Sequence, residues 1–258
     1  MIVSVNRNSK IMKQKSKPVP EKNIRRSPEI SKHPRAAKRA RSSKNRTNAP
    51  DVAEIFSRFH ALDPEPKGEL EYVNSFTLLV AVVLSAQATD AGVNKATRGL
   101  FKAADSPEKM LSLGEDNVRD FIKTIGLFRT KARNVVALSQ KLIADHEGKV
   151  PANREQLESL PGVGRKTANV VMNIAFGQPT MAVDTHVLRV SNRIGLSFGK
   201  TPLMVEEDLT HSIPAEFAMH AHHWLILHGR YLCKARKPEC WRCPIADLCQ
   251  FDAKSVSN

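Results

Sequence analysis

The strongest constraint on this chain is the grouping of its cysteines near the C-terminal end. Its four cysteines follow the spacing C-x6-C-x2-C-x5-C, as Cys233, Cys240, Cys243 and Cys249. Thiols this close together are typical of a ligand set for a metal centre. The spacing therefore predicts that a bound group organises this end of the chain.

Several interpretations of these thiols are open. Disulfides need an oxidising compartment, and no apolar secretory signal follows the first charges, so we expect reduced thiols in an intracellular protein. Zinc is usually held by two short C-x2-C knuckles, whereas an iron–sulfur cluster needs four thiolates around a larger object. Only Cys240 and Cys243 form a short knuckle, so the spacing favours the cluster over zinc and over unligated thiols.

Charge divides the chain into two unequal parts. Residues 1–50 hold 15 Lys and Arg against 2 Asp and Glu, which leaves residues 51–258 almost neutral within a total charge of +14. Residues 1–50 carry few large apolar side chains, so we predict a disordered basic tail that adds salt-sensitive affinity for DNA. A solubilising extension and a targeting peptide are the alternatives.

The rest of the chain is predicted to be all-α. Asp51 and Glu54 form a helix-start signature, and no alternating strand pattern of useful length follows. The apolar segment 76–86 is much too short to span a membrane. Helical patterns occupy 76–86, 92–103, 107–113, 116–124, 130–145, 154–160, 165–176, 185–194, 203–212 and 214–228.

The link between two of these helices, residues 160–164 with the sequence Leu-Pro-Gly-Val-Gly, resembles a helix-hairpin-helix turn. Gly162 and Gly164 let the backbone turn sharply, and the amides that follow are unpaired at a helix N-terminus. Such amides are a natural phosphate site, which predicts a clamp on a DNA backbone. An ordinary turn between helices is the alternative.

Lys166 lies in the first turn of the helix that follows this link. Its charge opposes the positive end of the helix dipole, and we expect that field and the neighbouring Arg165 to lower the pKa of the amine. A neutral amine is what nucleophilic attack requires. The pattern therefore favours a nucleophile over an ordinary surface lysine.

Asp184 precedes the expected helix 185–194, where it is placed to cap the helix. A carboxylate there can also stabilise a developing oxocarbenium ion and help to move protons from Lys166. We expect both roles.

The histidines His222, His223 and His228 lie on an apolar segment, and we expect them to be packed or hydrogen-bonded rather than metal ligands.

Taken together, these motifs resemble the endonuclease III family, the bifunctional DNA glycosylases and abasic-site lyases of the helix-hairpin-helix superfamily. The resemblance covers roughly residues 51–252. It rests on the segments 84–90 (LSAQATD), 125–127 (IGL), 160–168 (LPGVGRKTA), 183–186 (VDTH) and 223–230 (HWLILHGR), and on the cysteine spacing.

The resemblance assigns roles to individual residues. It implies a 4Fe-4S cluster on the four cysteines, a Schiff-base lysine at Lys166 and a catalytic aspartate at Asp184. Gln87 and Leu127 fall where the family inserts side chains into the duplex. Contacts with the DNA backbone are expected from Gly162, Val163, Gly164, Arg165, Lys234, Arg236 and Lys237.

The resemblance also implies an architecture and a reaction. Residues 68–178 would form a six-helix domain, 51–67 and 179–252 a cluster domain, and 253–258 a tail, with a DNA-binding cleft between two helical lobes. The expected activity is removal of oxidised pyrimidines from damaged double-stranded DNA, with β-elimination 3′ to the abasic site, by a monomer without a membrane partner.

Two other functions stay open from the sequence. An adenine glycosylase-like enzyme would share the hairpin and the cluster but lack the lysine nucleophile. A non-catalytic helix-hairpin-helix module would leave Lys166 and Asp184 unexplained. We expect a cytoplasmic, nucleoid-associated protein in a bacterium, and nuclear or mitochondrial targeting by the basic tail is the alternative.

Overall fold

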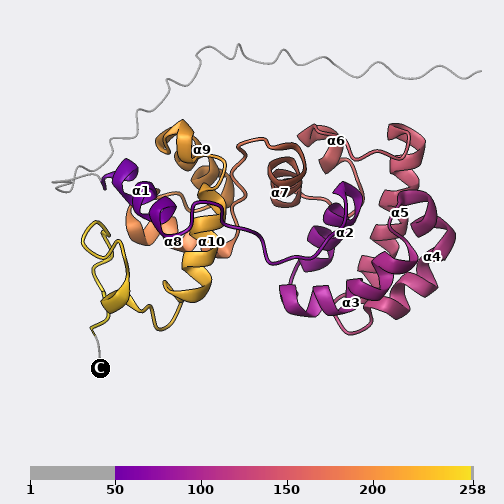
Figure 1. Cartoon of the computed structure of the whole chain (residues 1–258), viewed down its shortest axis with the longest axis horizontal. Coiled ribbons are helices and arrows are strands. Elements are labelled where there is room, and N and C mark those ends of the chain that lie inside the picture. The colour runs from indigo at the N-terminus through magenta and orange to yellow at the C-terminus, as the bar shows by residue number, and fades with distance from the viewer. Residues whose placement is uncertain (1–49, 257–258) are drawn as a thin grey trace, which may run out of the picture. The chain divides into compact units, whose positions relative to one another are not determined.

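The computed structural model describes residues 50–256, and every regular element in this range is helical, as expected. The predicted tail, apart from Pro50, lies outside the described residues, as do residues 257–258 of the expected C-terminal tail. Figure 1 shows the arrangement of the elements. They are α1 (Val52–Leu62), α2 (Ser75–Ser85), α3 (Asp90–Ala103), α4 (Pro107–Ile122), α5 (Phe128–His146), α6 (Arg154–Glu158), α7 (Arg165–Phe176), α8 (Thr185–Ile194), α9 (Pro202–Ser212), η1 (Ala215–Phe217), α10 (Ala221–Tyr231) and η2 (Cys240–Arg242).

Most of the α-helices begin at a polar side chain that accepts a hydrogen bond from a backbone amide of the first turn. Asp51 accepts from the amide of Glu54 at 3.0 Å, which confirms the expected start of α1. Asn74 caps α2 in a reciprocal capping box with Thr77. Because these caps satisfy amides that lack a helical partner, they fix where each helix begins.

Two helix boundaries test the sequence patterns most closely. Gly114 interrupts α4 with φ of 78°, as the separate patterns at 107–113 and 116–124 predict. The expectation of one helix over 214–228 was wrong, because the chain forms the short 3-10 helix η1 and then starts again as α10. Phe217 and Trp224 pack edge to face across this break, with ring centroids 6.3 Å apart, so packing of the two rings does not require a continuous helix.

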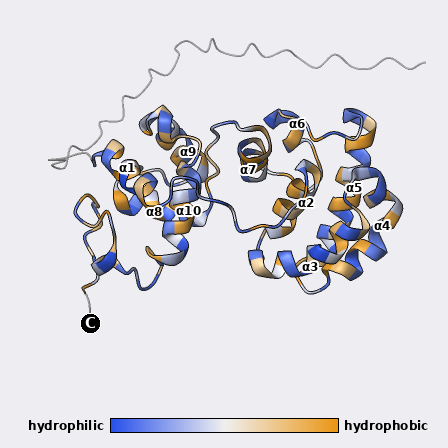
Figure 2. Cartoon of the chain, viewed as in Figure 1, coloured by the Kyte–Doolittle hydropathy of each residue, from blue (hydrophilic) through white to orange (hydrophobic). Residues whose placement is uncertain are grey.

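Two large hydrophobic clusters lie within the described residues. One contains buried residues from Phe76 to Met172, on α2 to α7 and the turns between them. The other joins α1 to α8, α9 and α10, and includes Phe56 and Trp224. Helix α2 is apolar on nearly every side, as its colour in Figure 2 shows, and it also reaches a small third cluster through Leu78 and Val82. The expected domain boundaries at residues 68 and 178 stay a prediction.

None of the helices in the part of the chain that the structure describes is long and apolar enough to cross a membrane.

Candidate functional site

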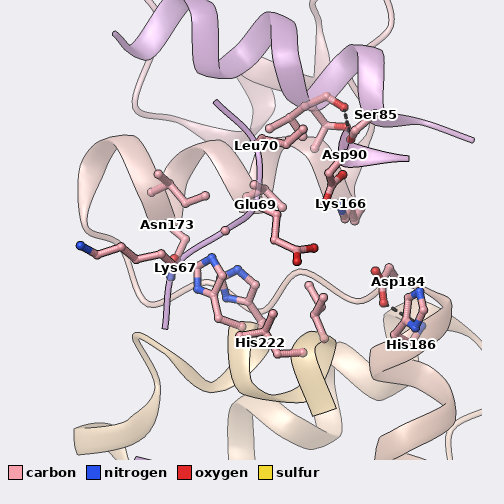
Figure 3. Close-up of a pocket in the computed structure, with 18 of the residues that line it drawn as sticks. Lys67, Glu69, Leu70, Ser85, Asp90, Lys166, Asn173, Asp184, His186 and His222 are labelled. Atoms are coloured by element: carbon pink, nitrogen blue, oxygen red, sulfur yellow. Dashed lines mark hydrogen bonds between the residues drawn. The ribbon is translucent and has the colours of Figure 1, made fainter. Parts of the chain in front are cut away.

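A cavity of about 990 Å³ opens where the ends of several elements meet. Its walls come from a segment at residues 66–72, which we call the strap, from the C-terminal end of α2 and the start of α3, and from α7, the start of α8 and α10. Lys166 and Asp184 both line this cavity, and Figure 3 shows them reaching it from different elements. An amine and a carboxylate from separate elements thus line one shared cavity.

Lys166 is partly buried in the first turn of α7. Burial lowers the pKa of its amine, and the nearby Arg230 acts in the same direction, while the carboxylates of Asp184 and Asp90 raise it. The pKa is lowered as expected from the sequence, but the main cause is desolvation. Because burial disfavours the ammonium form, a larger fraction of the amine is neutral and nucleophilic.

Arg165 differs from the expectation, because its side chain is engaged elsewhere. Its guanidinium donates two hydrogen bonds to Glu206 on α9, at 2.8 and 2.9 Å, and Arg154 donates to the same carboxylate at 3.2 Å. Glu206 is almost buried. Arg165 is not among the groups that shift the pKa of Lys166, so its expected influence on that amine was wrong.

Asp184 caps α8, which confirms the structural role expected from the sequence. Its Oδ1 accepts from the amides of His186 at 2.8 Å and of Val187 at 2.9 Å. Both bonds use the same oxygen, and Oδ2 has no hydrogen bond to any of the described residues. One oxygen therefore anchors the carboxylate while the other is available to a bound molecule.

A network of charged side chains, which the sequence did not predict, holds the cavity wall. Arg230 on α10 donates to Asp90 at 2.6 Å and also pairs with Glu69 of the strap, which accepts a hydrogen bond from Tyr231. Asn94 fixes the strap further by donating to the carbonyl of Glu69 at 2.8 Å. Asp90 and Arg230 lie in segments that carried the resemblance, whereas nothing in the sequence marked Glu69.

The turn between α6 and α7 has the geometry expected of the hairpin. Gly162 takes φ of 80°, and the amide of Val163 donates to the carbonyl of Leu160 at 3.1 Å. Val163 is buried, so its side chain anchors the turn instead of facing a ligand. A Cβ atom at Gly164 would meet nothing within 4 Å, and no side chain caps α7. The first amides of α7 therefore face open space at a helix N-terminus.

Gln87 and Leu127 share an unusual backbone conformation. They take φ of 54° and 59°, and both side chains are exposed. Gly126 brings their loops together, because a Cβ atom there would lie 3.7 Å from the carbonyl oxygen of Gln87. Gln87 lines the cavity, and the neighbouring Leu127 projects its apolar side chain into solvent.

The four cysteines line a second, small cavity beyond α10. Burial raises the pKa of Cys243 to about 11, and the thiols of Cys249, Cys233 and Cys240 add to this shift. No three His, Cys, Asp or Glu side chains of residues 50–256 are close enough to hold a single metal ion. Four thiols that line one common cavity suit an iron–sulfur cluster, which needs four thiolates around it.

Polar groups surround these thiols. Arg193 of α8 donates to the sulfur of Cys233 at 3.5 Å, and Nε2 of His228 lies 3.8 Å from the sulfur of Cys243. The loop between Cys233 and Cys240 carries the basic residues Lys234, Arg236 and Lys237. Among these, Lys234 pairs with Glu239 at 2.5 Å. Arg236 and Lys237 are exposed and form no ion pair with the described residues, which leaves their charges available to an anion.

The histidines of α10 lie in two environments. His228 packs against Phe59, with ring centroids 5.2 Å apart, as expected for a packed histidine. His222 and His223 line the cavity that contains Lys166. Their Nδ1 atoms are buried without a hydrogen-bond partner in the described part of the chain, which the sequence did not predict.

Comparisons with known proteins agree with this geometry. Residues 80–215 match the family described as "HhH-GPD superfamily base excision DNA repair protein", and residues 233–249 match the "Iron-sulfur binding domain of endonuclease III". The chain is 58% identical to endonuclease III of Treponema pallidum, over 77% of this chain and 94% of that protein. It is 54% identical to endonuclease III of Escherichia coli, over 78% of this chain and 95% of that protein.

Solved structures show the same similarity. A trapped covalent intermediate of endonuclease III with DNA matches with a TM-score of 0.72 and 45% identity, over 76% of this chain and 93% of that chain. A thermostable thymine-DNA glycosylase matches with a TM-score of 0.64 and 25% identity, over 77% of this chain and 94% of that one.

Proposed function

Because this chain belongs to the endonuclease III family, we propose that Lys166 is its nucleophile and Asp184 its catalytic carboxylate. The chain is a base-excision-repair DNA glycosylase that removes oxidised pyrimidines and, as an abasic-site lyase, cuts the strand on the 3′ side by β-elimination. The observation that carries the residue assignment is the shared cavity. It places the desolvated amine of Lys166 and the carboxylate of Asp184, which has one oxygen without a hydrogen bond to the described residues, beside one substrate.

Base removal begins when the damaged nucleotide leaves the duplex and enters the cavity. Extrusion costs a few kcal/mol, and less for a poorly stacked base. The neutral Nζ of Lys166 then bonds to the sugar C1′ as the bond between C1′ and the base breaks, and the base leaves with the electron pair. The free oxygen of Asp184 stabilises the positive charge that develops on the sugar ring.

Strand cleavage follows from the covalent link. A proton passes from the new C1′ ammonium to the ring oxygen O4′ as the bond between C1′ and O4′ breaks, which opens the ring and leaves a protonated imine between Lys166 and C1′. The imine makes the adjacent C2′ proton acidic. Its removal expels the 3′ oxygen with its phosphate, and water then hydrolyses the imine and restores the amine. The match to a trapped covalent endonuclease III–DNA complex supports this route.

The residues around the cavity have the properties that DNA binding requires. We propose that Gln87 fills the gap left by the extruded nucleotide and that Leu127 wedges the opposite strand, since both are exposed on adjoining loops. The amides that follow Gly164, including that of Arg165, are suited to a phosphate, because they lie at a helix N-terminus open to approach.

A 4Fe-4S cluster belongs to this family, and the four thiols suit it. Cys233, Cys240, Cys243 and Cys249 would hold it. When bound, the cluster cross-links the loop and supplies structural and electrostatic support. We propose that this support presents Arg236 and Lys237 to DNA phosphates, while Lys234 contributes less because Glu239 already neutralises it.

The same proposal covers the division into lobes and the number of chains needed for activity. The two hydrophobic clusters support separate lobes, at 68–178 and at 51–67 with 179–252, with DNA across the cleft between them. We further propose that one chain is sufficient for activity, because Lys166 and Asp184 line a cavity built by a single copy.

Duplexes with one oxidised pyrimidine, one abasic site or no damage test the residue assignment. The wild-type enzyme should release the base from the duplex with the oxidised pyrimidine and cut that strand. It should also cut the duplex with the abasic site and leave the undamaged duplex intact. Lys166→Gln should lose both activities, while Asp184→Asn should lose base release more than abasic-site cutting. Full activity of Lys166→Gln would overturn the assignment, and absence of an adduct with borohydride would favour an adenine glycosylase-like or non-catalytic function.

A further inference from the structure

Two adjacent histidines form part of the cavity wall but take no part in the proposed reaction steps. His222 and His223 lie in the first turn of α10, and both line the cavity together with Lys166. Their ring centroids are 3.9 Å apart with the planes tilted by 36°, so each ring restricts the other. Figure 3 shows His222 at the cavity wall opposite Lys166.

The hydrogen bonds of this pair indicate where each proton lies. Nδ1 of both rings is buried and has no partner in residues 50–256. A buried N–H without a partner is rarer than an unused acceptor, which favours Nδ1 as the unprotonated nitrogen. A neutral imidazole has only one proton, so Nε2 carries it and is a donor.

The position of Gly68 shows the direction of one donor. A Cβ atom at Gly68, on the strap, would lie 3.8 Å from Nε2 of His223. Gly68 and His223 both line the cavity, so this nitrogen lies where the strap and α10 approach each other at the cavity wall. His222, only 1% exposed, packs against the His223 ring.

The surroundings keep the pair uncharged. Burial lowers the pKa of His223 to about 4, with smaller contributions from His220 and Lys166. The pKa of His222 is also lowered well below its ordinary value, first by burial and then by His223, Lys166 and His220. A neutral donor can bind an oxygen in the cavity without adding a positive charge beside the Lys166 amine.

We propose that His223, packed against His222, contacts the extruded base by donating its Nε2 hydrogen to an exocyclic carbonyl oxygen of the pyrimidine. Oxidation or saturation across C5 and C6 removes aromaticity but leaves ring carbonyl oxygens in place. A carbonyl-directed donor therefore suits a set of damaged pyrimidines that share this group. The inference rests on the proposed function, since only an extruded base brings such an oxygen into the cavity.

The test separates base release from strand cutting. Full-length, cluster-loaded enzyme is given one duplex with thymine glycol and a matched duplex with an abasic site, under single-turnover conditions. His223→Leu should slow release of thymine glycol by about 10- to 100-fold, as expected for loss of a buried hydrogen bond to substrate. Cutting of the abasic duplex, which has no base to recognise, should stay within about 2-fold of wild type.

A second variant keeps the test decisive if His223→Leu does not fold. His223→Gln places an amide N–H near the position of Nε2 and should release thymine glycol within about 5-fold of wild type. His211→Leu, at an exposed histidine of α9, is the matched control and should behave as wild type.

Two results would overturn the proposal. One is unchanged base release in the folded His223→Leu variant. The other is an equal loss of base release and abasic-site cutting in a folded His223 variant, because a base contact affects only the first reaction. Failure of the wild-type enzyme to cut the abasic duplex would instead contradict the proposed function and not the role of His223.

Discussion

Gln87 and Leu127 both hold left-handed backbone conformations, with φ of 54° and 59°, on two loops that meet at Gly126. Among the described residues, Glu147 is the one other non-glycine residue with positive φ, and it ends α5 as an ordinary helix cap. Such conformations cost free energy and are concentrated at functional sites. Two of them on adjoining exposed loops beside the cavity mark a surface that is shaped for a ligand.

Replacing Leu127 with glycine should separate stability from activity. Glycine tolerates this conformation, so Leu127→Gly should leave the free energy of unfolding unchanged or raise it by about 0.5–1 kcal/mol. Base release from a lesion duplex should fall about 10-fold, because no side chain wedges the opposite strand. Denaturant unfolding and single-turnover assays measure the two effects.

Glu147→Gly is the matched control for this prediction. It relieves the same conformation at the end of α5 and should show the same stability change with normal activity. A Leu127→Gly enzyme that releases bases as fast as wild type would show that Leu127 is not a wedge.

Replacing Lys166 with methionine should stabilise the protein while it removes activity. Burial lowers the pKa of this amine, so the folded state disfavours its charged form at neutral pH. Lys166→Met should raise the free energy of unfolding by about 0.5–2 kcal/mol, the range common for single stabilising substitutions. Thermal melting of the cluster-loaded protein measures it, with the exposed Lys102→Met as control. A lower melting temperature in Lys166→Met than in the control would show that the environment of Lys166 does not disfavour the charged amine.

The pKa shift of His223 predicts how stability depends on pH. Its folded pKa of about 4 is below the ordinary value of 6.5, so folding favours the neutral ring. The stability of the fold should therefore be complete above pH 6.5 and decrease as the pH falls towards about 4. In His223→Gln the decrease should be smaller, because one group no longer titrates. Melting temperatures across this range measure the difference, and identical pH profiles would show that His223 does not titrate in this way.

The charges of the cysteine loop predict the salt dependence of DNA binding. Arg236→Ala and Lys237→Ala should each reduce the slope of log affinity against log salt by about 1, if each contacts one phosphate. Lys234→Ala should have a smaller effect, because Lys234 pairs with Glu239. Binding titrations at several salt concentrations, with iron content as a check on the loop, measure this. An unchanged slope in both Arg236→Ala and Lys237→Ala would exclude the loop from the DNA interface.

The sequence predicted most of the fold because its helix boundaries are local. Asp51 and Asp184 cap helices through side chains that reach only two or three residues along the chain, and Gly114 breaks α4 at its own position. The segment 214–228 was mistaken for one helix, because Phe217 and Trp224 have helical spacing and pack together although the helix is interrupted between them.

The site was less predictable wherever a contact joins distant segments. Arg165 was expected to act on its neighbour Lys166, but it pairs with Glu206 on α9. Desolvation of Lys166 depends on the whole cavity wall, which no local pattern encodes. Glu69 and His223 reach the cavity only because the strap and α10 fold against it. The roles of Gln87 and Leu127 came from the family resemblance, and their shared backbone conformation became visible only in the structure.

The most direct test of the account is to trap the covalent intermediate and identify the residue that carries it. Enzyme and a duplex with one oxidised pyrimidine are treated with borohydride, and the adduct is digested and mapped by mass spectrometry. The account predicts one modified peptide with the sugar remnant on Nζ of Lys166, and no adduct in Lys166→Ala. An adduct on another residue, or one that persists in Lys166→Ala, would contradict it.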